Sequence, residues 1–135
     1  MSFGQMVVLY ICALLIFFAI DLIWIGVVAK KFYRAQLGFI MSPRVKWAPA
    51  IIFYSLYIVG VLYFAIVPAL DGGSFGQAAL NAAFLGLLCY TTYDLSNQAT
   101  LKDWPIYVTV VDIIWGTTVT TAVAVLTFLI GQAIV

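Results

Sequence analysis

Long apolar runs divide the chain into four segments separated by three polar connectors. The runs cover about residues 5–29, 48–70, 75–97 and 105–130. An α-helix rises about 1.5 Å per residue, so each run is close to or above the ~20 residues that cross a hydrocarbon core. In lipid, a segment of this length pairs its backbone polar groups most simply as a helix. The pattern predicts an all-α fold, a bundle of four transmembrane helices.

The second and third connectors are short and contain turn residues. Residues 71–76 read DGGSFG, and their glycines favour a tight turn. Residues 101–105 read LKDWP, which places Asp103 shortly before Pro105. Because proline is favoured in the first turn of a helix, we expect Asp103 to cap the fourth helix.

The first connector, residues 30–47, is the longest and is partly periodic. Its apolar side chains recur at helical spacing while its basic side chains point elsewhere, until Ser42 and Pro43 interrupt the pattern. Such a pattern suits an extension of the first helix or a short helix that lies in the membrane interface. We predict a short cytoplasmic interfacial helix between the first two spans. Its apolar positions are Tyr33, Leu37, Ile40 and Met41.

The composition agrees with a membrane location. Hydrophobic residues make up 66% of the chain and charged residues 8%, with a mean hydropathy of +1.17. A soluble domain is nearer half apolar and a quarter charged. We expect one membrane domain over residues 1–135. The first apolar run has no basic residue before it and is too long for the core of a signal peptide, so we expect it to be a retained span.

The basic residues predict the orientation. All six lie in the first and third connectors, which four spans place on the same side of the membrane. Lysine and arginine collect on the cytoplasmic side. Both termini and the DGGSFG connector are therefore expected on the non-cytoplasmic side. The basic residues are Lys30, Lys31, Arg34, Arg44, Lys46 and Lys102.

Several chemistries are disfavoured by the residues available. The chain has no histidine and no glutamate, which removes histidine-ligated metals and a Ser-His-Asp relay. Cys12 and Cys89 lie in apolar runs without the spacing of a metal or redox site, and suit small buried side chains. We expect no metal, no cofactor and no nucleic-acid partner.

Three aspartates fall at similar depth in three different spans. Asp21 precedes the cytoplasmic end of the first run by about nine residues, Asp94 lies near the end of the third, and Asp112 lies about two turns into the fourth. A carboxylate within a span is costly and usually faces the bundle interior. The structural alternative is that each aspartate makes a hydrogen bond between helices. The functional alternative is a ligand-binding, proton-binding or catalytic role.

Two of these aspartates belong to a repeated tetrapeptide. Residues 21–24 read DLIW and residues 112–115 read DIIW. Positions three apart share a helix face, so Trp24 lies beside Asp21 and Trp115 beside Asp112. The repetition suits either an inverted duplication or chance. We predict that Asp21 and Asp112 approach each other in the bundle interior, with both tryptophans nearby.

The third aspartate lies in a polar stretch, CYTTYDLSNQAT. Tyr90, Tyr93 and Asn97 lie within about one turn of Asp94. These side chains either complete a shared site or are solvated at the membrane boundary. The candidate ligand-binding or proton-binding residues are thus Asp21, Asp94, Asp112, Trp24, Trp115, Tyr90, Tyr93 and Asn97.

No basic residue lies within a span to neutralise these acids. Three alternatives remain. The carboxyls are protonated, since burial and like charge both disfavour ionisation. They pair with Lys30, Lys31 or Arg34 reaching down from the first connector. Or they bind a cationic or polar ligand.

The stretch YTTYDLSNQATLKDWP, followed by VDIIWG, resembles a family of small bacterial membrane proteins, domain of unknown function 2177. The resemblance covers nearly the whole chain and implies a four-helix integral protein of the bacterial inner membrane. It brings no established activity, so no catalytic role is transferred. The residues that carry it are Tyr93-Asp94-Leu95, Asn97, Trp104-Pro105, Asp112 and Trp115-Gly116, with Asp21 and Trp24.

Three functions fit these features. The first is an enzyme or binding protein for a membrane lipid or another small apolar or cationic molecule, in a cavity that opens to the cytoplasmic leaflet. Its chemistry would be limited to isomerase-, cyclase- or hydratase-like steps, or to binding alone. The second is a small proton-coupled transporter that acts as a homodimer. The third is an accessory membrane subunit whose polar residues hold helices together.

Overall fold

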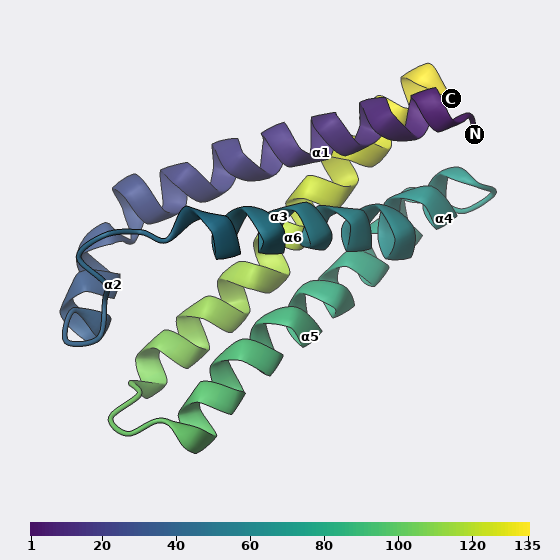
Figure 1. The fold of residues 1–135 in the computed structure, drawn as a ribbon. Coiled ribbons are helices and arrows are strands. Elements are labelled where there is room, and N and C mark those ends of the chain that lie inside the picture. The colour runs from purple at the N-terminus through teal and green to yellow at the C-terminus, as the bar shows by residue number, and fades with distance from the viewer.

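The fold consists of long helical segments packed into one bundle, described over all residues 1–135 by a computed structural model (Figure 1). There is no strand, so the predicted all-α class is confirmed. Two short π-helices, η1 and η2, interrupt the first and second long segments. The elements are α1 (Phe3–Ile23), η1 (Trp24–Val28), α2 (Lys30–Leu37), α3 (Trp47–Val61), η2 (Leu62–Ile66), α4 (Val67–Leu70), α5 (Phe75–Thr100) and α6 (Ile106–Ile134).

Three segments are long and apolar enough to cross a membrane: Phe3–Val28, Trp47–Leu70 and Ile106–Ile134. The predicted third span corresponds to α5, which has 26 residues but is not among them. Its mean hydropathy is lowered by Gln77, Asn81 and the polar residues near its end. Within the bundle, α5 packs most extensively against α6.

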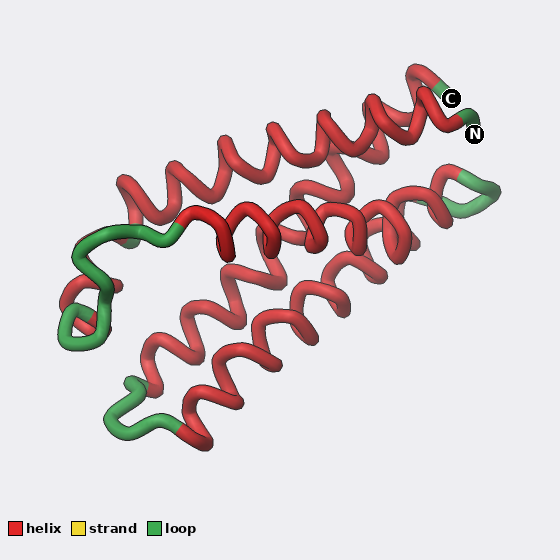
Figure 2. Tube along the Cα trace, in the orientation of Figure 1, coloured by secondary structure: helices red, strands yellow, loops and turns green.

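The two ends of the bundle differ in charge. At one end the termini meet, where the Gln5 side-chain amide donates to the Ile134 carbonyl at 3.0 Å, and the connector between α4 and α5 lies nearby (Figure 1). At the other end lie α2, the loop that follows it and the turn between α5 and α6 (Figure 2). All six basic residues belong to this second end, called the basic end below, and all are exposed.

The turn between α5 and α6 departs from expectation. Asp103 does not cap α6: its φ of 62° places it in the left-handed region, and the helix begins after Pro105 without a side-chain cap. A side-chain network holds the turn instead. The Trp104 indole donates to Thr109 Oγ1 at 3.0 Å, Thr109 donates to Gln98 Oε1 at 2.7 Å, and the Gln98 amide donates to the Trp104 carbonyl at 3.2 Å.

The core lies where α1, α3, η2 and α6 meet, and small residues bring α5 against α6. A Cβ on Gly86 of α5 would collide with the Gly116 carbonyl and the Thr120 side chain of α6. This close approach is typical of helix packing in membranes. The Tyr57 hydroxyl also hydrogen-bonds Thr120, which links α3 to α6. The largest fully buried core side chains include Phe17, Leu9, Ile58, Ile66 and Val61.

Candidate functional site

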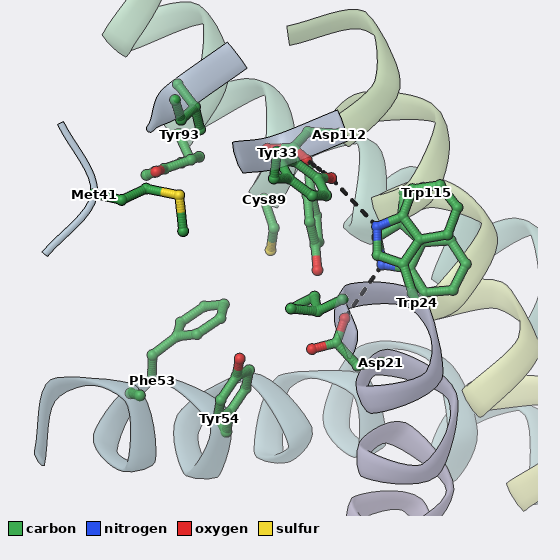
Figure 3. Close-up of a pocket in the computed structure, with 14 residues that line it drawn as sticks. Asp21, Trp24, Tyr33, Met41, Phe53, Tyr54, Cys89, Tyr93, Asp112 and Trp115 are labelled. Carbon is green, nitrogen blue, oxygen red and sulfur yellow. Dashed lines mark hydrogen bonds between the residues drawn. The ribbon is translucent and has the colours of Figure 1, made fainter. Parts of the chain in front are cut away.

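A cavity of about 580 Å³ lies between α1, α2, α3, α5 and α6 (Figure 3), and its lining includes residues of α2 and of the following loop at the basic end. Twelve of its 14 lining residues are hydrophobic, and two carboxylates, Asp21 and Asp112, supply the charge. The wall is thus largely apolar and half of its residues are aromatic, with acidic groups on two sides. The lining residues are Asp21, Trp24, Ile25, Tyr33, Leu37, Met41, Ala50, Phe53, Tyr54, Cys89, Tyr90, Tyr93, Asp112 and Trp115.

Asp21 is held at the cavity wall by a tryptophan from the opposite helix. It lies near the end of α1 and is only 6% exposed. The Trp115 indole N–H of α6 donates to its Oδ1 at 3.3 Å. The second carboxyl oxygen points into the cavity, on the side of Tyr54 (Figure 3). Asp21 therefore keeps an acceptor available to a molecule in the cavity.

Asp112 is held by a tyrosine from α2. The Tyr33 hydroxyl donates to Asp112 Oδ1 and accepts a hydrogen bond from the Trp24 indole at 3.3 Å. Burial and the adjacent Asp112 carboxylate raise the pKa of Tyr33 above its ordinary value of 10.0. Tyr33 is thus a neutral hydrogen-bond donor at physiological pH, and it fixes α2 over the cavity.

The two tryptophans of the repeated tetrapeptide stack on each other. The Trp24 and Trp115 ring centroids are 4.3 Å apart and the planes differ by 7°. Trp24 begins the π-helix η1, in which the Ala29 N–H bonds the carbonyl of Trp24 at 2.7 Å, five residues back. π-Helical turns of this kind are frequent at functional sites. Here the wider turn begins three residues after Asp21 and leads the chain into α2.

A glycine orients another wall residue. The Tyr90 ring of α5 lies directly against Gly116 of α6, and a Cβ at Gly116 would overlap that ring. The glycine therefore provides the space in which Tyr90 stands at the cavity wall. Gly26, which follows the first tetrapeptide as Gly116 follows the second, has open space around its α-carbon.

The predicted site residues divide into two groups. Asp94 is fully buried and neither of its carboxyl oxygens has a hydrogen-bond partner. It lies outside the cavity lining but close enough to Asp112 for the two carboxyls to interact. Asn97 is half-buried and also lies outside the lining. The other six, which line the cavity, are Asp21, Trp24, Tyr90, Tyr93, Asp112 and Trp115.

The basic residues do not neutralise the acids. Lys30, Lys31 and Arg34 are all exposed, and the groups that donate to Asp21 and Asp112 are an indole and a phenol. The three neighbouring carboxyls of Asp21, Asp94 and Asp112 therefore receive hydrogen bonds from only two neutral groups, the Trp115 indole and the Tyr33 phenol. The arrangement can accept hydrogen bonds from a bound molecule, and can exchange a proton with it.

Sequence reasoning missed the contribution of α2 and α3 to the wall. The periodic face of the first connector was expected to lie in the membrane interface, yet Tyr33, Leu37 and Met41 from that face line the cavity. The helical spacing of these side chains indicates an apolar face, but it does not indicate whether that face contacts lipid or a cavity inside the protein. Phe53 and Tyr54 of α3 had no distinguishing signal in an apolar helix.

A family model described as "Predicted membrane protein (DUF2177)" matches residues 6–129. No curated protein and no solved structure shows significant similarity to the chain. Since the match spans nearly the whole sequence, the chain belongs to the DUF2177 family of predicted membrane proteins.

Proposed function

We propose that this membrane protein binds a small apolar molecule, such as a lipid, with the molecule's polar group against Asp21 and Asp112. The observation that carries the proposal is the cavity itself, whose apolar wall holds two carboxylates. Ligand sites commonly combine an apolar lining with a few polar groups that fix orientation. Met41 and Phe53 stand at one side of the space and Asp21 at the other (Figure 3), so a tail and a head group have distinct surroundings.

The same proposal assigns a topology. We propose four spans in a bacterial inner membrane, with α5 as the third, because its 26 residues suffice to cross and it packs along the apolar helix α6. The six positive charges gathered at the basic end support a cytoplasmic location for that end. The cavity would then open toward the cytoplasmic leaflet. The interfacial helix is α2, whose exposed basic residues face the lipid head groups while its apolar face covers the cavity.

A quenching experiment tests the binding proposal. In a Trp47→Phe background, purified protein is titrated with ω-bromododecanol, because bromine quenches nearby indoles. Trp24 and Trp115 line the cavity, while Trp104 is buried in the α5–α6 turn and serves as an internal reference. We expect saturable quenching confined to the Trp24–Trp115 emission. Quenching that rises linearly with probe, as for simple partitioning, would contradict a site.

A matched pair of variants locates the site. Ala50 lines the cavity, whereas Ala99 is exposed on α5 outside it. Ala50→Phe fills part of the space and should abolish saturable quenching, and Ala99→Phe should leave it unchanged. Equal loss in both variants, or in neither, would place the binding elsewhere.

The alternatives predict different outcomes. A proton-coupled transporter would move protons with its ligand across sealed vesicles, and an accessory subunit would co-purify with a protein instead of a small molecule. The cavity lies toward one end of the bundle, whereas alternating-access sites usually lie near the membrane midplane. That position favours a binding site reached from one leaflet.

A further inference from the structure

The charge around the cavity is one-sided. Asp21 and Asp112 line it and Asp94 is buried close to Asp112, while no lysine or arginine is among the lining residues. An isolated charge in an apolar site is costly, and a bound counter-charge offsets that cost. A head group whose only charge is a carboxylate or a phosphate would instead add like charge. We therefore expect the site to favour a positively charged head group over a negatively charged one.

Hydrogen bonding narrows the class further. Trp115 donates one bond to Asp21 and Tyr33 donates one to Asp112, whereas Asp94 receives none. The second oxygen of Asp21 faces the cavity on the side of Tyr54, and the Trp115 indole bonds only the first oxygen (Figure 3). Buried polar atoms are normally satisfied, so a ligand that enters should bring donors. A primary ammonium group has three N–H donors, and an alcohol has one.

The walls suit such a group. Seven of the 14 lining residues are aromatic, from Trp24 and Tyr33 to Trp115. Aromatic rings attract ammonium groups and tolerate the methylenes next to them. We infer that the ligand bound in this cavity carries a protonated amine with at least one N–H, directed at Asp21 and Asp112. This inference rests on the proposed function and specifies the chemical class of its ligand.

A head-group series tests the inference with one tail. The probes are ω-bromododecyl amine, its trimethylammonium analogue, ω-bromododecanol and ω-bromododecanoate, read by quenching of Trp24 and Trp115. Binding is taken as the difference between wild type and Ala50→Phe, which removes partitioning. We expect the amine to bind at least about tenfold more tightly than the alcohol, since charge-assisted hydrogen bonds are about twice as strong as neutral ones. The carboxylate should bind most weakly.

The outcomes separate the two proposals. If no probe gives saturable quenching, the binding function itself fails. If all four bind within about threefold, an apolar site exists but the amine inference is wrong. Equal affinity of the amine and its trimethyl analogue would also overturn it, because the N–H donors would then contribute nothing.

Variants test the role of the acid. Asp21→Asn keeps the shape and still accepts from Trp115, so it should fold, lose about tenfold in amine affinity and lose much less in alcohol affinity. Asp71→Asn, in the exposed connector at the other end, is the matched control and should change neither. An equal effect on amine and alcohol would refute a charge-specific contact.

Two sources could present this amine, a lipid head group or a free long-chain amine. Nanodiscs containing phosphatidylethanolamine or phosphatidylcholine, each with the same anionic lipid, distinguish them. Competition against ω-bromododecyl amine by the ethanolamine lipid alone would identify a lipid amine. Competition by neither lipid identifies a free amine, and equal competition by both would overturn recognition of the N–H group.

Discussion

Replacing Tyr33 by Phe should release α2 from the cavity. No residue of α2 is fully buried, so its position depends strongly on the Tyr33 hydroxyl, which donates to Asp112 and accepts from Trp24. Hydrogen bonds between membrane helices average about 0.6 kcal/mol and reach about 1.7. The bond to a carboxyl belongs at the upper end and the 3.3 Å indole bond at the lower end. Together they stabilise the docked helix by about 2 kcal/mol, which is about thirtyfold in its opening equilibrium.

Hydrogen exchange followed by mass spectrometry on a peptide covering α2 measures that equilibrium. For amides that exchange through local opening, Tyr33→Phe should speed exchange by about thirtyfold while α6 keeps its protection. Tyr63→Phe is the matched control, because the Tyr63 side chain is 71% exposed and should leave exchange unchanged. An α2 that exchanges at the wild-type rate in Tyr33→Phe would refute the view that this hydroxyl anchors it.

Because the pKa of Tyr33 is raised in the docked state, docked α2 holds the phenol proton more tightly than undocked α2 does. The free energy of docking is therefore fully present below pH ~10, and it falls by about 1.4 kcal/mol per pH unit as the pH rises above that value. Emission of the Trp24–Trp115 pair, followed from about pH 9 to about pH 12, should report this loss, and Tyr33→Phe should lack it. Gly116→Ala forces the Tyr90 ring to move and should destabilise the protein by about 1–3 kcal/mol in unfolding measurements, whereas Gly26→Ala has open space and should not show that steric cost. Reporter fusions should show residue 135 outside the cytoplasm and the loop at residues 38–46 inside it, and the reverse result would overturn the orientation.

Helix positions were accessible from the apolar pattern because insertion into lipid constrains length and composition together. The pattern predicts the first span at about 5–29, and the helical segment covers Phe3–Val28. It predicts the second at about 48–70, and the segment covers Trp47–Leu70. The interruptions η1 and η2 were not foreseen. A π-helical turn adds one residue to a turn without changing which residues are apolar, so periodicity in a uniformly apolar helix does not reveal it.

Only part of the site could be predicted from the sequence, for a related reason. Asp21 and Asp112 stood out because charge is rare in these helices, and their tryptophans stood out through repetition. Tyr33 did not, because an amphipathic face has the same spacing whether it packs on lipid or on a cavity. Asp94 shared the depth of the other acids, yet depth along a helix does not fix the direction of a side chain, and it is buried behind Asp112 instead of lining the cavity.

The opposite directions of α1 and α6 explain why the two tetrapeptides, DLIW and DIIW, contact each other. Along α1 the chain runs toward the basic end, so Trp24 lies nearer that end than Asp21; along α6 it runs away, so Trp115 lies farther from that end than Asp112. Asp21 is therefore level with Trp115, and Asp112 is level with Trp24. The stacked rings connect the two levels, with Trp115 bonding Asp21 directly and Trp24 reaching Asp112 through Tyr33. Asp21 thus takes its donor, Trp115, from α6, and Asp112 takes its donor, Tyr33, from α2. Neither α1 nor α6 could build the site alone. Because Tyr33 lies between Trp24 and Asp112, and no α2 residue lies between Trp115 and Asp21, the hydrogen bond of Asp112 depends on the position of α2 and that of Asp21 does not.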